Sequence, residues 1–125
     1  MRARTVLVID DDEDVRSVVE FSLELGGGWR VMGEGNGDNA VARAVEVGPD
    51  VILLDVNLGQ QDGATVLAAL RADARTTGIP VLFLTANVRA ADVARLRALG
   101  AGVLAKPFDP LTLGAKIAAE MGWAS

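Results

Sequence analysis

Cysteine and histidine are both absent from this 125-residue chain. Without cysteine, the chain can form neither a disulfide bond nor a thiolate metal site. The absence of histidine removes the commonest general base and the commonest zinc ligand. Any chemistry must therefore rest on carboxylate, lysine, arginine, serine or threonine side chains.

The chain also has no excess of positive charge and no long apolar run. Twelve Lys and Arg against 17 Asp and Glu give a net charge of -5, which argues against direct nucleic-acid binding because that binding needs a basic face. No apolar stretch approaches membrane-spanning length, and no secretory signal is recognisable. We therefore expect a soluble cytoplasmic protein that binds neither nucleic acid nor membrane.

Strand and helix patterns alternate along the whole chain. Half of the residues are hydrophobic, which suffices for a packed core in one domain over residues 1–125. The alternation predicts an α/β domain with a parallel sheet, without linker, repeat or appended output domain. Strands are expected at 5–10, 30–34, 51–55, 81–85 and 102–105, and helices at 13–25, 39–47, 64–72, 90–99 and 110–121.

The expected architecture is a doubly wound, five-stranded parallel sheet of the flavodoxin-like (βα)5 type. Right-handed crossovers place helices on both faces of such a sheet. A common strand order is 2-1-3-4-5, whose switch point lies between strands 1 and 3. Ligands of open parallel sheets bind at the switch point, outside the carboxyl ends of the strands.

The first and last helices carry the most specific local signals. Asp12 or an adjacent acid is expected to cap the first helix, and Gly26-Gly27-Gly28 to end it. Pro110 suits the first turn of the last helix. The apolar spacing of the first helix places five residues on one face: Val15, Val18, Val19, Ser22 and Leu25.

Charged residues follow three of the expected strands. Asp10-Asp11-Asp12 follows the first strand, Asp55 ends the third, and Lys106-Pro107 follows the fifth. Because parallel strands end at one edge of the sheet, we expect these carboxylates and one ammonium to converge there. Clustered carboxylates repel one another and attract a hard cation such as Mg²⁺. The pattern therefore indicates metal-assisted phosphoryl chemistry.

In their order and positions, these elements resemble the receiver domain of two-component response regulators, of the single-domain, chemotaxis-regulator-like kind. The resemblance covers essentially the whole chain. It implies a domain that accepts a phosphoryl group from a histidine kinase or histidine phosphotransfer protein and switches conformation to control a partner or output domain. Such a domain catalyses only its own phosphorylation and dephosphorylation. The matching segments are Val8-Ile9-Asp10-Asp11-Asp12, Leu53-Leu54-Asp55-Val56-Asn57-Leu58, Asp62-Gly63, Leu84-Thr85-Ala86 and Lys106-Pro107-Phe108.

The resemblance assigns roles to four residues near the expected metal. Asp55 is the expected phosphoacceptor, since a carboxylate can attack phosphorus and form an acyl phosphate. Asp11 is expected to bind Mg²⁺ directly and Asp10 mainly through a metal-bound water. Asn57 stands where the family supplies a backbone carbonyl to the metal.

Three further residues complete the site that the resemblance implies. Lys106 is expected to pair with Asp55 and then to bind a phosphoryl oxygen as a point charge, with a cis Lys106–Pro107 bond. The Thr85 hydroxyl is expected to donate to a phosphoryl oxygen, and Ala86 to leave room for that group. Taken alone, Thr85 is equally explained by the preference of β-branched residues for strands.

The chain departs from the family pattern at three places. Val103 stands where the family usually has Tyr or Phe, so the aromatic switch is expected to be absent or replaced. Gly59 replaces a common proline, which predicts a more mobile loop after Asp55. Asn57 and Asn87 occupy positions that tune phosphoryl lifetime, and neither offers a carboxylate to orient water. Fast self-dephosphorylation is therefore not expected.

Two other functions fit parts of the pattern. A phosphorylation-independent pseudo-receiver, acting as a protein-interaction module, would explain Val103 and the missing proline. Such a module has no need for the complete set of acidic and basic site residues. A phosphohydrolase of the haloacid dehalogenase kind would need an aspartate two residues after its nucleophile, where this chain has Asn57.

A partner surface is expected near the end of the domain. In receivers, the fourth helix, fifth strand and fifth helix form the usual output and dimer face. The last helix has two apolar stripes, one with Leu111 and one with Leu113 and Ile117. One stripe packs on the sheet; the sequence leaves open whether Leu113 and Ile117 face a partner or are buried under Trp123.

Overall fold

The computed structural model describes residues 4–87 and 89–123, so both ends of the expected 1–125 domain lie outside the described residues. Strands and helices alternate as expected. The strands are β1 (Thr5–Ile9), β2 (Arg30–Glu34), β3 (Val51–Asp55), β4 (Val81–Thr85) and β5 (Gly102–Ala105). The helices are α1 (Glu13–Gly27), α2 (Ala40–Val47), α3 (Gly63–Ala72), α4 (Ala90–Ala98) and α5 (Leu113–Met121), with a short 3-10 turn at Gly37–Asn39 before α2.

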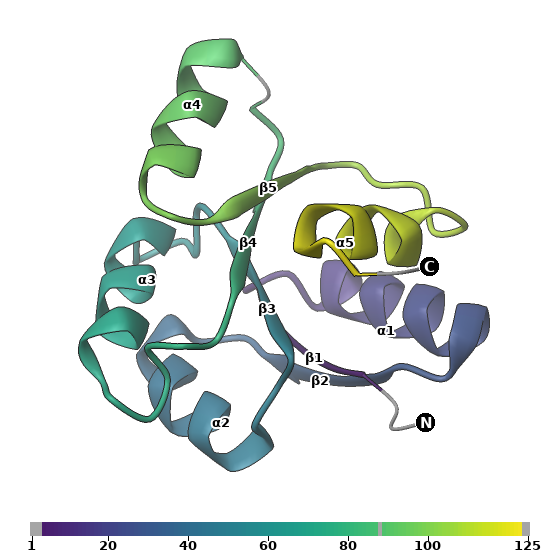
Figure 1. The fold of residues 1–125 in the computed structure, drawn as a ribbon, viewed down its shortest axis with the longest axis horizontal. Coiled ribbons are helices and arrows are strands. Elements are labelled where there is room, and N and C mark those ends of the chain that lie inside the picture. The colour runs from purple at the N-terminus through teal and green to yellow at the C-terminus, as the bar shows by residue number, and fades with distance from the viewer. Residues whose placement is uncertain (1–3, 88, 124–125) are drawn as a thin grey trace.

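All strand pairs are parallel, and their order is β2-β1-β3-β4-β5. Helices α1 and α5 cover one face of the sheet, and α2, α3 and α4 cover the other (Figure 1). This confirms the expected doubly wound fold. Ile9 on β1 pairs with Leu54 on β3, so the residues that follow, Asp10 and Asp55, are neighbours at the switch point.

The central strands of the sheet are buried on both faces, which explains why they read as continuous apolar runs. Every residue of β3 and β4 is buried. Successive side chains on a strand point to opposite faces. Ile52 and Leu54 accordingly pack under α2, α3 and α4, while Val51 and Leu53 pack under α1 and α5.

Helix α1 begins and ends as the sequence predicts. The Asp12 side chain accepts a hydrogen bond from the Asp14 N–H at 2.9 Å, which satisfies one of the free donors of the first turn. Gly28 ends the helix with a φ of 75°, in the left-handed conformation that glycine adopts without strain.

The predicted apolar face of α1 is partly wrong. Val19 and Leu23 are buried against the sheet, whereas Val18 and Leu25 are 39% and 68% exposed. Residues i and i+4 lie on one side of a helix, and this side includes Leu23 instead of Leu25. Ser22 is also buried there, and its hydroxyl is satisfied by donating to the Val18 carbonyl at 2.6 Å.

Helix α5 begins at Leu113, three residues later than Pro110 suggests. The Asp109 carboxylate accepts the Leu111 N–H at 2.9 Å, which stabilises a turn ahead of the helix. Leu113 and Ile117 are fully buried, so this stripe packs on the sheet, whereas Leu111 is 88% exposed.

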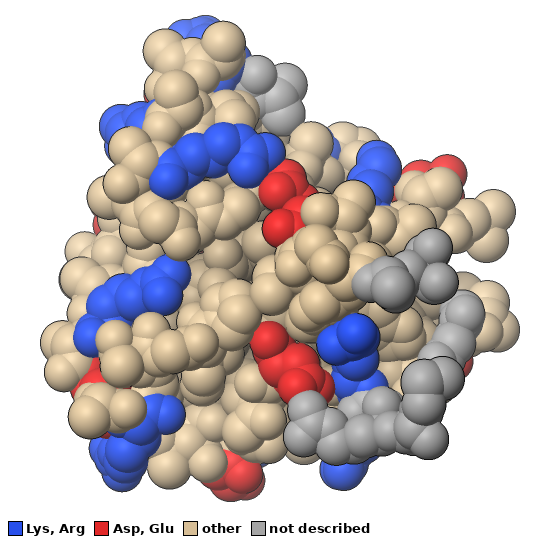
Figure 2. All heavy atoms as spheres, in the orientation of Figure 1, with Lys and Arg blue, Asp and Glu red and all other residues tan. Residues whose placement is uncertain are grey.

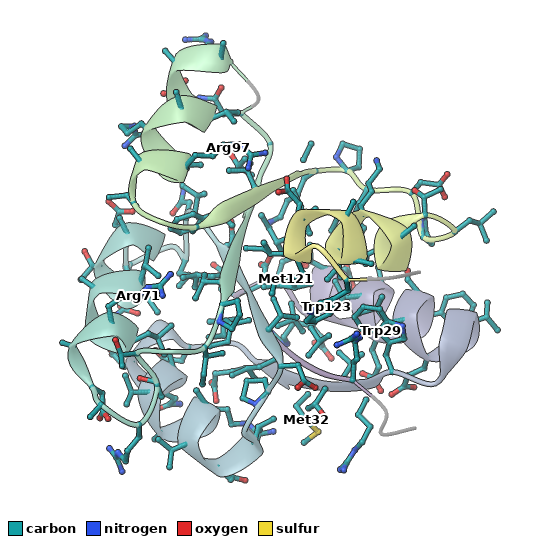
Figure 3. The ribbon with its side chains drawn as sticks, viewed as in Figure 1. Trp29, Met32, Arg71, Arg97, Met121 and Trp123 are labelled. Carbon is teal, nitrogen blue, oxygen red and sulfur yellow. The ribbon has the colours of Figure 1, made fainter. Side chains whose placement is uncertain are left out.

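Two tryptophans pack against each other near α1 and α5. Trp29 and Trp123 lie side by side between α1 and α5 (Figure 3), with ring centroids 6.0 Å apart. The Arg4 guanidinium lies 3.8 Å from the centre of the Trp123 ring, within the range of a cation–π interaction. Both tryptophans also pack against the apolar core that lies under α1 and α5.

Charges of both signs are dispersed over the face of the molecule that Figure 2 shows. On the face in Figure 2, Lys and Arg side chains form separate groups divided by uncharged surface. Within residues 4–87 and 89–123, no helix has the length and apolar character needed to span a membrane.

Candidate functional site

Asp55 is the last residue of β3, and its side chain is almost fully buried. One carboxylate oxygen, Oδ1, accepts the Asn57 N–H at 3.2 Å, and Oδ2 lies 3.4 Å from Lys106 Nζ. Burial raises the pKa of Asp55 above its ordinary value of 3.8, and the charge of Asp10 raises it further. The Asn57 N–H and Lys106 oppose this shift without cancelling it.

Asp10 lies beside Asp55 and is fully buried. Its Oδ1 accepts the Asp12 N–H at 2.9 Å, and its Oδ2 accepts a hydrogen bond from Lys106 Nζ at 2.8 Å. A buried carboxylate is costly unless it is paired and hydrogen-bonded. Both oxygens of Asp10 meet that condition.

Lys106 connects β5 to the two aspartates. Its Nζ forms ion pairs with Asp10 at 2.8 Å and with Asp55 at 3.4 Å, and the Lys106–Pro107 peptide bond is cis as expected. The expected pairing with Asp55 is therefore present, but the shorter contact is with Asp10. Burial disfavours the charged form of Lys106, yet the hydrogen bonds and charges of Asp10 and Asp55 together outweigh it, so the pKa of Lys106 rises above 10.5.

Asp10, Asp11 and Asp55, three of the four residues predicted to hold a metal ion, lie together. One carboxylate oxygen from each lies within 4.8 Å of the others. Asp11 is exposed to solvent, whereas the other two are buried. Hard oxygen ligands with access to water match the preference of Mg²⁺, which takes a few carboxylates and keeps several waters. The residues present therefore fit this cation.

The loop after β3 places Asn57 next to Asp55 and Gly59 next to Asp11. The exposed Asn57 side chain accepts the Gly59 N–H at 3.1 Å. Gly59 has a φ of 77°, and a Cβ at this position would lie 3.1 Å from Asp11 Oδ2. The backbone conformation therefore favours glycine here, and a Cβ would also press against the Asp11 carboxylate.

Gly63 closes the same loop at the start of α3. Its N–H donates to the Val56 carbonyl at 2.7 Å. A Cβ here would overlap the Asp55 carbonyl oxygen and lie 2.9 Å from Val56 Cα. Because these are backbone atoms, they cannot rotate away, and Gly63 sets how closely α3 approaches Asp55.

Thr85 ends β4 at the same edge of the sheet and is buried. Its hydroxyl accepts the Asn87 N–H at 3.0 Å and donates to the Asn87 carbonyl at 3.3 Å. The Asn87 side chain donates in turn to Asp92 on α4 at 2.9 Å. In this arrangement the Thr85 hydroxyl is bound to the β4–α4 loop and not to Asp55.

Val103 on β5, which stands in place of the aromatic residue that the family resemblance led us to expect, is buried. It belongs to the apolar cluster with Phe83, Leu96 and Ala101 under α4. A groove of about 300 Å³ lies along β5 and α5, and Val103, Leu104 and Lys116 are among the residues that line it.

An ion pair joins the helices on either side of β5. Arg97 extends from α4 where this helix meets β5 (Figure 3), and its Nη2 lies 2.8 Å from Glu120 Oε1 on α5.

Asp10 also has a contact with α1 that the sequence patterns do not predict. Arg16 on α1 donates from Nη1 to the Asp10 carbonyl oxygen at 2.6 Å. A possible sequence signal is the pair of glycines, Gly33 and Gly35, at and just beyond the end of β2, because both lie against this arginine.

The fold and the site together define a doubly wound α/β domain with an acidic cluster and a lysine at its switch point. The family model of the response regulator receiver domain matches residues 6–118, and the chain belongs to this family. It is therefore a receiver domain of two-component signalling.

Several known proteins are similar to the chain. It is 38% identical to RpaA of Synechocystis, a DNA-binding dual master transcriptional regulator, over 91% of this chain and 47% of RpaA. It is also 38% identical to PhoB of Escherichia coli, the phosphate regulon transcriptional regulatory protein, over 95% of this chain and 52% of PhoB. The chain thus spans about half the length of these curated relatives.

Among solved structures, the chemotaxis response regulator CheY4 of Vibrio cholerae has a TM-score of 0.85. It is 31% identical to this chain, and the match covers 94% of this chain and 98% of CheY4.

Proposed function

We propose that Asp55 accepts a phosphoryl group from the phosphohistidine of a partner kinase or phosphotransfer protein, in a Mg²⁺-dependent reaction. The observation that carries this proposal is the joint position of Asp55, the acidic pair and Lys106. Carboxylate oxygens of Asp10, Asp11 and Asp55 lie within 4.8 Å of one another, and Lys106 lies 3.4 Å from Asp55. A pseudo-receiver without phosphoryl chemistry would not need this set.

The proposed reaction is a displacement at phosphorus. An Asp55 oxygen forms the new P–O bond, the P–N bond to the donor histidine breaks, and its electron pair stays on the imidazole. Bound Mg²⁺ would supply positive charge to the phosphoryl oxygens. Lys106 supplies a second positive charge at the same place, and Asp10 and Asp11 would hold the metal.

Phosphorylation is then proposed to change the loop after β4. The Thr85 hydroxyl, now bound to Asn87, would turn to donate to a phosphoryl oxygen. This movement breaks its contacts with the Asn87 backbone and so alters the start of α4, which Asn87 holds through Asp92. A two-state equilibrium biased in this way would carry the signal to the surface of α4, β5 and α5, the proposed face for an output partner or a second copy.

The transcriptional relatives are about twice as long as this chain. The proposed function therefore covers phosphoryl transfer and switching within this domain, and not the transcriptional regulation for which these relatives are named.

A titration with Mg²⁺ and beryllofluoride, an acyl-phosphate mimic, tests the proposal. Amide NMR shifts would be followed in the wild type and in Asp55→Asn. The proposal expects saturable shifts around Asp55 in the wild type alone, extending to α4 and β5. The absence of any shift in the wild type would favour the pseudo-receiver, and equal shifts in Asp55→Asn would refute Asp55 as the acceptor.

A further inference from the structure

Arg16 reaches back from α1 to the end of β1. The side chain is half-buried, and Nη1 donates to the Asp10 carbonyl oxygen at 2.6 Å. A hydrogen bond from a charged donor to a partly buried acceptor is stronger than one between neutral groups. The contact therefore fixes one end of the peptide unit that joins Asp10 to Asp11.

The end of β2 is shaped to admit this arginine. A Cβ on Gly35 would lie 2.9 Å from Arg16 Nη1, and a Cβ on Gly33 would lie 3.2 Å from Arg16 Cδ. Neither glycine has a positive φ, so the backbone conformation does not require glycine at either position. The space that Arg16 occupies accounts for the missing side chains.

The remaining polar groups of Asp10 are already held. Its N–H donates to the Glu34 carbonyl at 3.1 Å, Oδ1 accepts from Asp12 and Oδ2 accepts from Lys106. The fourth polar group of Asp10 is its carbonyl oxygen, which accepts the hydrogen bond from Arg16. Asp10 is thus fixed on every side.

Asp11 is held differently. It is exposed, and among the described residues none forms a hydrogen bond with its carboxylate. Its position near Asp10 and Asp55 therefore depends on its backbone. The orientation of the Asp10–Asp11 peptide unit sets that backbone, and Arg16 binds the oxygen of this unit.

We propose that Arg16 is a positioning residue for the metal site, which holds the Asp10–Asp11 peptide so that the Asp11 carboxylate faces Asp55. Gly33 and Gly35 provide the recess that allows it to do so. This inference rests on the proposed function, because it concerns the Mg²⁺ that the phosphorylation needs. Arg16 itself touches neither the metal nor the reacting atoms.

Two substitutions of Arg16 test the proposal. Arg16→Lys keeps the charge but loses the planar, multi-donor head, and Arg16→Gln loses the charge as well. Mg²⁺ affinity would be measured by isothermal titration calorimetry well below the melting temperature of each variant. Both variants are expected to bind Mg²⁺ about tenfold or more weakly, because groups that orient metal ligands typically change affinity by roughly 10- to 100-fold.

Gly35→Ala tests the contact between Arg16 and the Asp10 carbonyl without changing Arg16 itself. Its Cβ would displace the guanidinium while Arg16 stays in the chain, so the same loss of affinity is expected. Gly78→Ala is the matched control, since a Cβ there meets nothing within 4 Å and Gly78 has no positive φ. If Gly35 acts only through Arg16, adding Gly35→Ala to Arg16→Gln should weaken binding no further.

Three outcomes separate the possibilities. Weak Mg²⁺ binding in the Arg16 variants and Gly35→Ala, with normal binding in Gly78→Ala, supports the positioning role. Wild-type affinity in all Arg16 variants and in Gly35→Ala overturns it, even if their melting temperatures fall, because a merely structural residue would change stability alone. A wild type that binds no Mg²⁺ refutes the proposed function itself.

Discussion

Lys106 lies closer to Asp10 than to Asp55. Its Nζ is 2.8 Å from Asp10 Oδ2 and 3.4 Å from Asp55 Oδ2. The lysine therefore mainly compensates the fully buried acid, and the pKa of Asp55 stays raised because burial and the charge of Asp10 are only partly offset. Two carboxylates that share one ammonium leave negative charge uncompensated, and this favours the binding of a cation.

Asp55→Asn should stabilise the metal-free protein at neutral pH. Because the folded state raises the pKa of Asp55 above 3.8, the stability linked to this group is present below 3.8 and is lost as the pH rises through the folded-state value. At neutral pH the ionised carboxylate therefore costs stability, and the neutral amide removes that cost. Urea unfolding in EDTA should show a higher midpoint for Asp55→Asn at neutral pH and a much smaller difference below 3.8. An equal or lower midpoint at neutral pH would contradict the raised pKa.

Asp10→Asn should lower the pKa of both of its charged neighbours. Lys106 loses the hydrogen bond and charge that raise its pKa, and Asp55 loses a repelling charge. Carboxyl and lysine NMR titrations would measure both shifts. Asp12→Asn is the matched control, because Asn caps a helix as well as Asp and Asp12 lies outside the acidic trio. Unchanged titration of Asp55 in Asp10→Asn would show that the two acids do not interact.

Gly59→Ala should destabilise the protein and disturb the metal site together. An alanine at a φ of 77° is strained, and its Cβ would lie 3.1 Å from Asp11 Oδ2. The left-handed conformation costs a non-glycine residue about 1–2 kcal/mol. Chemical denaturation would measure this loss, and a Mg²⁺ titration should show weaker binding than in Gly78→Ala. A variant with wild-type stability and Mg²⁺ affinity would mean that the loop tolerates a side chain at this position.

Arg97 and Glu120 should contribute little to global stability, although their ion pair joins α4 to α5. The pair is 2.8 Å long, but the Arg97 side chain is half exposed, and exposed pairs contribute about 0.2–1 kcal/mol. A double-mutant cycle with Arg97→Ala and Glu120→Ala, measured by urea unfolding, should give a coupling in this range. A coupling of several kcal/mol would identify the pair as a main support of this face.

Much of the fold and the site could be predicted from local signals. Apolar runs that end in Asp10 and Asp55, separated by capped amphipathic helices, point to a parallel sheet with acids at its switch point. The rules of handedness and crossover made the order 2-1-3-4-5 a common candidate, and the structure has this order. The Lys106-Pro107 pair completed the motif that identified the family.

What could not be predicted depends on how helices rotate and which polar groups meet in space. The buried face of α1 includes Leu23 instead of Leu25, because the rotation of a helix is set by packing on the sheet. The contact of Arg16 with Asp10 follows from that rotation, since it joins α1 to the end of β1. Pro110 permits a helix start, but the bond from Leu111 to Asp109 delays it. Likewise, the hydrogen bond between the Thr85 hydroxyl and the Asn87 N–H depends on the folded β4–α4 loop and could not be predicted from the sequence.

Phosphoryl transfer to Asp55 is tested most directly by intact-mass measurement. The wild type, Asp55→Asn and Asp12→Asn would be incubated with acetyl phosphate, a small phosphoryl donor, with Mg²⁺ or with EDTA. We expect one added phosphoryl group in the wild type and in Asp12→Asn with Mg²⁺, and none with EDTA or in Asp55→Asn. Labelling of Asp55→Asn to the same extent as the wild type, or a wild type that stays unlabelled with Mg²⁺ and donor present, would contradict Asp55 as the phosphoacceptor.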